Sequence, residues 1–181
     1  MVDALERAIK LTYGLSSGDL QYRVICYCLG DGKYPVGAAA LELFLEKYRG
    51  ENGDENHWKF IAIDPLLPKR DGGSVNATSI FHDKIEIFSG FSQDYSIENT
   101  HRHDLSGGND SKDPPLLSIV IACHSHAPLE EFWERVPEPK LCVSMPCCAQ
   151  FSELPKETPI FEYDNFEVYS PKRRIKIFAS T

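Results

Sequence analysis

The sequence predicts an α/β domain whose mostly parallel sheet ends in an antiparallel hairpin, with reduced helix content. Residues 24–29 and 116–123 are continuous apolar runs, which are typical of central strands covered on both faces. A glycine turn and a helical pattern follow the first run, as in a strand–helix–strand unit. The connections 66–82 and 90–115 show no helical periodicity, so we expect fewer helices than such a sheet normally carries.

The other elements follow from hydrophobic spacing and turn residues. Residues 3–14 carry apolar side chains at helical spacing, and Pro35 begins a second helix that runs to about residue 48. The remaining apolar segments predict strands at 58–63, 84–89 and 141–145, a short helix at 128–135, and a final hairpin of 161–169 and 173–179 around Ser170-Pro171-Lys172.

Length and composition set limits on the class of protein. The chain has 181 residues, so we expect a single domain spanning residues 1–181. A formal net charge of −8 argues against a broad basic surface for nucleic acid. We expect no membrane span and no secretory signal, because no apolar run is long enough and the N-terminus lacks a basic start. The six cysteines do not form a disulfide framework, which favours a cytoplasmic or nuclear location.

The first candidate site is a glycine turn paired with a carboxylate. The segment YRVICYCLGDG (22–32) ends in the turn, and FIAID (60–64) ends in Asp64. In open α/β sheets such a turn lies under a nucleotide-type ligand, and the acid accepts hydrogen bonds from the ribose. Asp31 would repel a pyrophosphate, so S-adenosylmethionine (SAM), with its cationic amino acid, suits the turn better. The predicted cofactor-binding residues are Leu29, Gly30, Asp31, Gly32 and Asp64.

A simpler interpretation of the same residues stays open. Gly30 and Gly32 would then form only a strand-to-helix turn, and Asp64 would cap the end of its strand before Pro65.

The second candidate site joins two strand ends, ACHSH (122–126) and MPCC (145–148). With the five predicted strands ordered 3-2-1-4-5, these ends are neighbours at the ligand crevice. His124 or His126 would handle a proton, while Cys147 or Cys148 would shape the acceptor pocket. The predicted catalytic residues are therefore His124, Cys147 and Cys148.

Two other interpretations of this cluster are considered. A zinc site could draw on Cys28, Cys123, His124, His126, Cys147 and Cys148. The usual metal-ligand spacings are missing, so no metal site is predicted. Alternatively, the cysteines are small buried hydrophobic residues and the histidines are hydrogen-bonded loop residues.

The segments SIVIACHSHAPLEEFW (118–133) and VSMPCC (143–148) resemble the cysteine-rich branch of class I SAM-dependent methyltransferase-like proteins. Members place a His-x-Cys-Gly type motif after the fourth strand and a Pro-Cys-Cys or Cys-Cys-His motif after the fifth. The branch includes enzymes that methylate tRNA ribose. The resemblance implies a Rossmann-like class I methyltransferase fold with SAM as cofactor. This chain departs from the pattern at Cys26 and Cys28, where the family has an acid and a glycine, and at Cys123-His124, where the motif order is reversed.

The resulting hypothesis is a minimal SAM-dependent methyltransferase that acts on RNA (tRNA or rRNA) and depends on a partner. The basic run Lys172, Arg173, Arg174 and Lys176 is either a solvated hairpin or an RNA contact. Apolar residues at 61, 63, 85 and 87 predict sheet faces that a second copy or another protein would cover. The alternatives are a non-catalytic Rossmann-like subunit that binds another protein and, more weakly, a zinc or thiol-redox protein.

Overall fold

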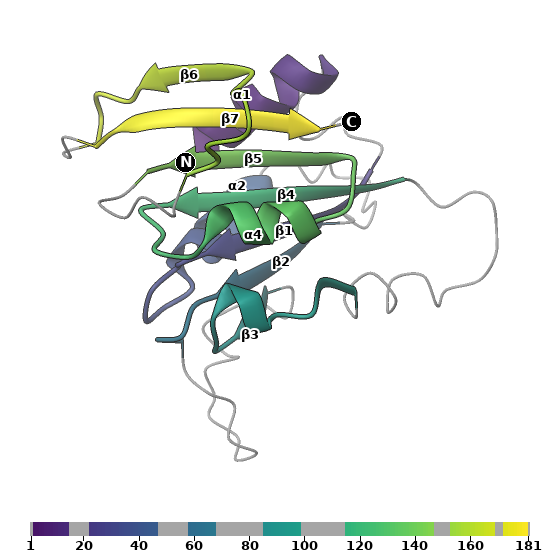
Figure 1. Ribbon diagram of the computed structural model, residues 1–181, viewed down its shortest axis with the longest axis vertical. Coiled ribbons are helices and arrows are strands. Elements are labelled where there is room, and N and C mark those ends of the chain that lie inside the picture. Colours follow the sequence, from purple (N-terminus) through teal and green to yellow (C-terminus); the bar gives the residue numbers. More distant parts are fainter. Residues whose placement is uncertain are drawn as a thin grey trace.

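The computed structural model describes residues 2–14, 22–46, 58–67, 85–98, 115–146, 153–168 and 172–180. It shows an α/β protein built on one seven-stranded sheet (Figure 1). The strands are β1 (Arg23–Leu29), β2 (Trp58–Ile63), β3 (Ile85–Phe88), β4 (Leu116–Cys123), β5 (Lys140–Met145), β6 (Phe161–Asp164) and β7 (Arg174–Ser180). The helices are α1 (Val2–Tyr13), α2 (Val36–Glu46), the short 3₁₀ helix η3 (Ser92–Asp94) and α4 (Leu129–Arg135).

The sheet has the order β3-β2-β1-β4-β5-β7-β6. Strands β1 to β5 pair in parallel, and β7 pairs antiparallel with both β5 and β6. The α/β class, the mostly parallel sheet, the order 3-2-1-4-5 and the closing hairpin are therefore confirmed. Because β1 lies between β2 and β4, the chain leaves the carboxyl ends of these strands in different directions, which leaves room for a site at this edge.

The two sheet faces carry different layers. One core cluster joins α1 and α2 to side chains such as Val24 and Cys26. The other joins α4 and the η3 segment, defined as η3 with its flanking residues (91–97), to Ile25 and Tyr27. Successive residues of a strand point to opposite faces, so β1 is buried on both. This explains why its sequence is continuously apolar. Within the described residues, no helix is both long and apolar enough to cross a membrane.

The predicted uncovered sheet face receives cover from the chain itself. Tyr95 and Ile97, in a connection expected to lack structure, are 4% and 5% exposed in the core cluster on the α4 face. The Tyr95 ring packs edge-on against Tyr27 at a centroid distance of 6.1 Å. Residues 68–84 and 99–114, the rest of the two long connections, lie outside the described residues. Cover by a second copy or another protein stays a prediction.

The strand β6 is shorter than the sequence predicted, because it ends at Asp164 and not at residue 169. Asn165 ends it by starting a turn: its side-chain oxygen accepts the Glu167 N–H at 3.0 Å, and its carbonyl accepts the Val168 N–H at 3.2 Å. Ser170 and Pro171 of the predicted turn lie outside the described residues.

The packing of α4 on the sheet predicts a large loss of stability for Phe132→Ala. Phe132 is fully buried, and its ring lies 5.4 Å from that of Tyr27. Deleting it should lower the free energy of unfolding by about 3–5 kcal/mol, because a cavity remains. Phe166→Ala is the matched control, since Phe166 is 75% exposed, and it should change stability by about 0.5 kcal/mol at most. Urea unfolding of both variants measures this, and similar losses in the two would contradict the packing of α4.

Candidate functional site

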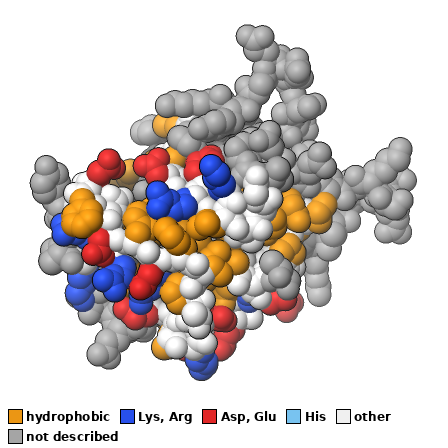
Figure 2. Space-filling model, turned by 90° about the horizontal axis from the view of Figure 1, so that it is seen from above, with side chains coloured by type: hydrophobic (Ala, Val, Ile, Leu, Met, Phe, Trp, Pro, Cys, Tyr) orange, Lys and Arg blue, Asp and Glu red, His pale blue; other side chains and the backbone are white. Residues whose placement is uncertain are grey.

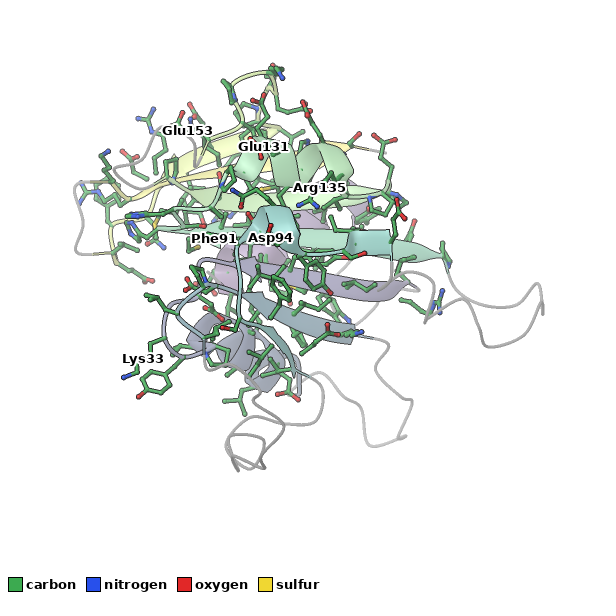
Figure 3. The ribbon with its side chains drawn as sticks, turned by 60° about the horizontal axis from the view of Figure 1, so that its bottom comes forward. Lys33, Phe91, Asp94, Glu131, Arg135 and Glu153 are labelled. Atoms are coloured by element: carbon green, nitrogen blue, oxygen red, sulfur yellow. The ribbon has the colours of Figure 1, made fainter. Side chains whose placement is uncertain are left out.

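A cavity of about 660 Å³ opens at the carboxyl edge of the parallel strands. The segments that follow β1, β2, β3 and β4 all contribute to it, together with the first turn of α4. Its walls are Gly30, Ile63, Asp64, Pro65, Leu66, Gly90, Phe91, Ser92, Gln93, His124, His126, Ala127, Pro128 and Glu131. Figure 3 shows Arg135 on α4 beside the η3 segment that carries Phe91 and Asp94.

Asp64 lines this cavity and also holds two backbone segments together. Its Oδ2 accepts the Gly32 N–H at 3.0 Å, and its Oδ1 accepts the Leu66 N–H at 2.7 Å. The residue is 8% exposed, so these bonds compensate for burial of the carboxylate. A carboxylate has about four acceptor positions, which leaves capacity for a ligand hydroxyl. The structural role is established by these contacts, while the ribose-binding role stays a prediction.

The two turn glycines differ in their surroundings. Gly30 and Gly32 both adopt positive φ, 70° and 80°. A Cβ on Gly30 would lie 2.6 Å from Ser125 Oγ and 2.9 Å from Ser125 Cα, whereas one on Gly32 would meet nothing within 4 Å. The turn after β1 therefore packs directly on the loop after β4, and Gly30 is required there both by its conformation and by this contact.

Of the other residues predicted to bind the cofactor, Gly32 does not line the large cavity, and neither do Leu29 and Asp31. Leu29 is 2% exposed and belongs to the core cluster on the α4 face. Asp31 accepts the Gly37 and Ala38 N–H groups at 2.7 and 3.0 Å, which makes it a cap for the first turn of α2. Burial raises the pKa of this carboxyl, and the two N–H donors partly offset the rise. Both residues line a smaller cavity of about 280 Å³ with Gly30, Cys28 and Cys123.

The strand ends that carry the second predicted cluster are neighbours, as expected. Cys123 pairs with Met145 in the parallel register of β4 and β5, and the His124 N–H donates to the Met145 carbonyl at 2.9 Å. His124 has a φ of 51°, an uncommon backbone conformation for a residue other than glycine. Both His124 and His126 line the large cavity. Cys147 and Cys148 lie outside the described residues, so their predicted approach to His124 stays a prediction.

Cys28, Cys123 and Cys142 are protonated thiols at neutral pH. Burial raises the pKa of Cys123 to about 11 and that of Cys142 further. A hydrogen bond with Cys26, followed by burial, raises the pKa of Cys28. Because the thiolate is the form that binds metals and attacks electrophiles, these environments disfavour both chemistries. In the part of the chain that the structure describes, no group of three or more metal-binding side chains occurs.

The basic run near the C-terminus lies among carboxylates. Arg174 lies 3.2 Å from Asp164 and 3.9 Å from Glu162, and Lys176 lies 3.5 Å from Glu153. Figure 2, which views the hairpin side of the molecule, shows basic and acidic side chains interspersed. Arg174 and Lys176 are therefore partly neutralised, so the run attracts phosphate less strongly than its sequence alone suggested.

The sequence interpretation missed the walls contributed by Phe91, Ser92, Gln93 and Glu131. The first three follow β3, in a connection that showed no periodicity. The position of Gly90 and Phe91 directly after the third apolar run could have indicated this wall. The carboxyl ends of parallel strands share one edge of the sheet, so residues that follow them lie near the same crevice.

In comparisons with known proteins, no family model, curated protein or solved structure matches this chain.

The contact between the two loops predicts a difference between two alanine substitutions. Gly32→Ala should lower the free energy of unfolding by about 1–2 kcal/mol, the cost of a left-handed backbone. Gly30→Ala should lower it by about 2–5 kcal/mol, because overlap with Ser125 adds to the same strain. Urea unfolding of the two variants measures the difference. Equal losses would mean that the Gly30 turn does not pack on Ser125.

The raised pKa of Cys123 predicts an alkaline loss of stability. Its thiol has a folded pKa of about 11 against an ordinary value of 9.0, so the unfolded chain loses this proton first. The contribution is fully present below pH 9 and is lost as the pH rises from 9 to 11, by about 1–3 kcal/mol. Cys123→Ala should reduce this loss in urea unfolding measured across that range. An identical pH slope in wild type and variant would be evidence against a raised pKa for this thiol.

Proposed function

We propose that this protein is a minimal SAM-dependent methyltransferase that acts on RNA delivered with a partner protein. The observation that carries the proposal is the large cavity in which the Gly30 turn, the Asp64 carboxylate and the Phe91 wall meet at the carboxyl edge of the sheet. Ligands of open α/β sheets bind in this place.

The shape and chemistry of the cavity suit a nucleoside. Its volume of about 660 Å³ lies within the usual range of about 300–1,000 Å³ for small-molecule sites. Leu66 and Phe91, 68% and 59% exposed, offer apolar surface for a flat base, and Asp64 offers an acceptor for ribose hydroxyls. A nucleoside combines an aromatic ring with hydroxyl groups, so it uses both kinds of wall.

The architecture supports the same proposal. A parallel sheet of order 3-2-1-4-5 that continues into an antiparallel hairpin is the layout expected for a Rossmann-like class I methyltransferase. In that fold the glycine turn after the first strand and the acid after the second face one ligand. Here Gly30 and Asp64 line one cavity, and Asp64 holds the turn through the Gly32 N–H.

The proposed reaction asks little acid–base chemistry of the protein. Bound SAM supplies a methyl group already activated by its sulfonium. Holding the acceptor atom in line with that methyl group then provides most of the acceleration. His124 and His126 line the cavity, where either imidazole can take the proton of an acceptor hydroxyl.

The choice of RNA with a partner follows from the distribution of charge. The chain carries a net charge of −8, and Arg174 and Lys176 of its basic run are paired with carboxylates. Such a surface binds a polyanion weakly. In this proposal the partner therefore supplies the RNA-binding surface, and this chain supplies the cofactor site.

A second candidate function, a non-catalytic subunit, has an observation in its favour. Val36, Ala40 and Leu43 repeat at helical spacing on α2 and are all exposed, Val36 by 63% and Leu43 by 57%. Val36 and Ala40 also border the smaller cavity, and an exposed apolar stripe of this kind is suited to binding another protein.

Calorimetry with SAM and S-adenosylhomocysteine (SAH) separates the two functions. Micromolar binding of either ligand supports the methyltransferase. Absence of binding, together with a stable stoichiometric complex with another protein, supports the non-catalytic subunit and contradicts the first proposal.

The proposed role of Asp64 predicts weaker ligand binding in Asp64→Ala. Loss of the acceptor for the ribose should reduce SAH binding by roughly 1–3 kcal/mol. The substitution also frees the Gly32 and Leu66 N–H groups, so affinity is measured by calorimetry on protein shown to be folded by circular dichroism. Asn165→Ala is the control, because it removes a side-chain bond to a backbone N–H in the hairpin. A folded Asp64→Ala protein that binds SAH like wild type would falsify the ribose role.

A further inference from the structure

The Arg135 side chain donates hydrogen bonds to several backbone carbonyls of the η3 segment. Its Nη1 donates to the Gln93 and Tyr95 carbonyls at 3.3 and 3.0 Å, and its Nη2 donates to the Ser92 carbonyl. Its Nε donates to the Glu131 carbonyl of α4 at 3.4 Å. The guanidinium also lies 5.4 Å from the centroid of the Phe132 ring.

These contacts join two walls of the cavity. Ser92 and Gln93 line it from η3, and Glu131 lines it from α4. A three-residue 3₁₀ helix has little stability of its own, because it closes too few hydrogen bonds to offset the ordering of its backbone. The position of this wall relative to α4 therefore depends on contacts with other elements. Arg135 bonds the carbonyls of Ser92 and Gln93 in the wall and of Tyr95 just after it.

Arginine is well suited to this arrangement. Its planar guanidinium offers five N–H donors in a fixed fork, so one side chain can satisfy several carbonyls at once. Those carbonyls are directed to Arg135 on α4, while Phe91, Ser92 and Gln93 line the cavity. Ser92 Oγ lies 3.4 Å from Gln93 Oε1, within reach of a hydrogen bond that orients this amide.

We infer that Arg135 is a positioning residue, which holds the Phe91–Gln93 wall in place for the base of a bound nucleoside. The inference rests on the proposed function, since it assigns the base to that wall. Arg135 itself does not line the cavity. Its effect on binding is exerted through the backbone of η3.

Lys140, the first residue of β5, provides a matched control because it bonds to the same helix. Its Nζ donates to the Trp133 and Val136 carbonyls at 2.9 and 3.1 Å and lies 4.5 Å from the centroid of the Trp133 ring. It thus stabilises the C-terminal end of α4 with a cation, as Arg135 does, without bonding η3. Lys140→Met should lower stability and leave ligand affinity unchanged.

The test is SAH calorimetry on wild type, Arg135→Ala, Arg135→Lys and Lys140→Met, each on protein shown to be folded. We expect Arg135→Ala to weaken SAH binding by about tenfold or more and Arg135→Lys to weaken it less. Amide hydrogen exchange should be faster at residues 92–97 in Arg135→Lys than in Lys140→Met. This second measurement keeps the test decisive should Arg135→Ala not fold.

The outcomes distinguish this inference from the proposed function. If wild type binds no SAH, the proposed function fails and the inference fails with it. If wild type binds and Arg135→Ala binds equally well, only the inference is overturned. Equal loss of affinity in Lys140→Met would also overturn it, because the effect would then reflect the general stability of α4.

Discussion

The Asp64 carboxylate is the contact on which the candidate site depends. Through Gly32 and Leu66 it ties the turn after β1 to the segment after β2. A buried carboxylate is tolerated only when its oxygens are bonded, and backbone N–H groups meet that need here. Since Gly30 of the same turn packs on Ser125, one chain of contacts fixes the loops after β2, β1 and β4. The opposite wall has a different support, the bonds from Arg135 to η3. The cavity thus lies between two independently supported walls.

The sequence predicted the fold well where burial leaves a continuous signal. Strands β1 and β4 are covered on both faces and therefore read as unbroken apolar runs. The predicted length of β6 was wrong. The strand ends at a turn that begins with Asn165, and the spacing of polar residues did not indicate that turn. The η3 segment was missed, since three residues are too few to show a period and its bonds to Arg135 join residues about 40 positions apart.

The site was predictable only in part. A short motif indicates the backbone conformation of a segment more reliably than it indicates what each side chain contacts. Gly30 and Asp64 line the large cavity, as the pairing of turn and acid suggested. Asp31, in the same motif, caps α2, and nothing in its immediate sequence separates a cap from a ligand contact. Leu29 is a core residue because β1 is covered on both faces, which is also why its sequence is continuously apolar. Cys147 and Cys148, outside the described residues, keep their predicted roles as predictions.

The central claim is that one nucleoside ligand contacts both walls of this cavity. Two-dimensional ¹H–¹⁵N NMR during titration with SAH tests it most directly, because each backbone amide reports separately. The account predicts saturable shifts at Gly30, Leu66 and Ser92, which belong to three separate loops, and none in β6 or β7. Shifts confined to the hairpin, or none at concentrations well above those of typical cofactors, would contradict it.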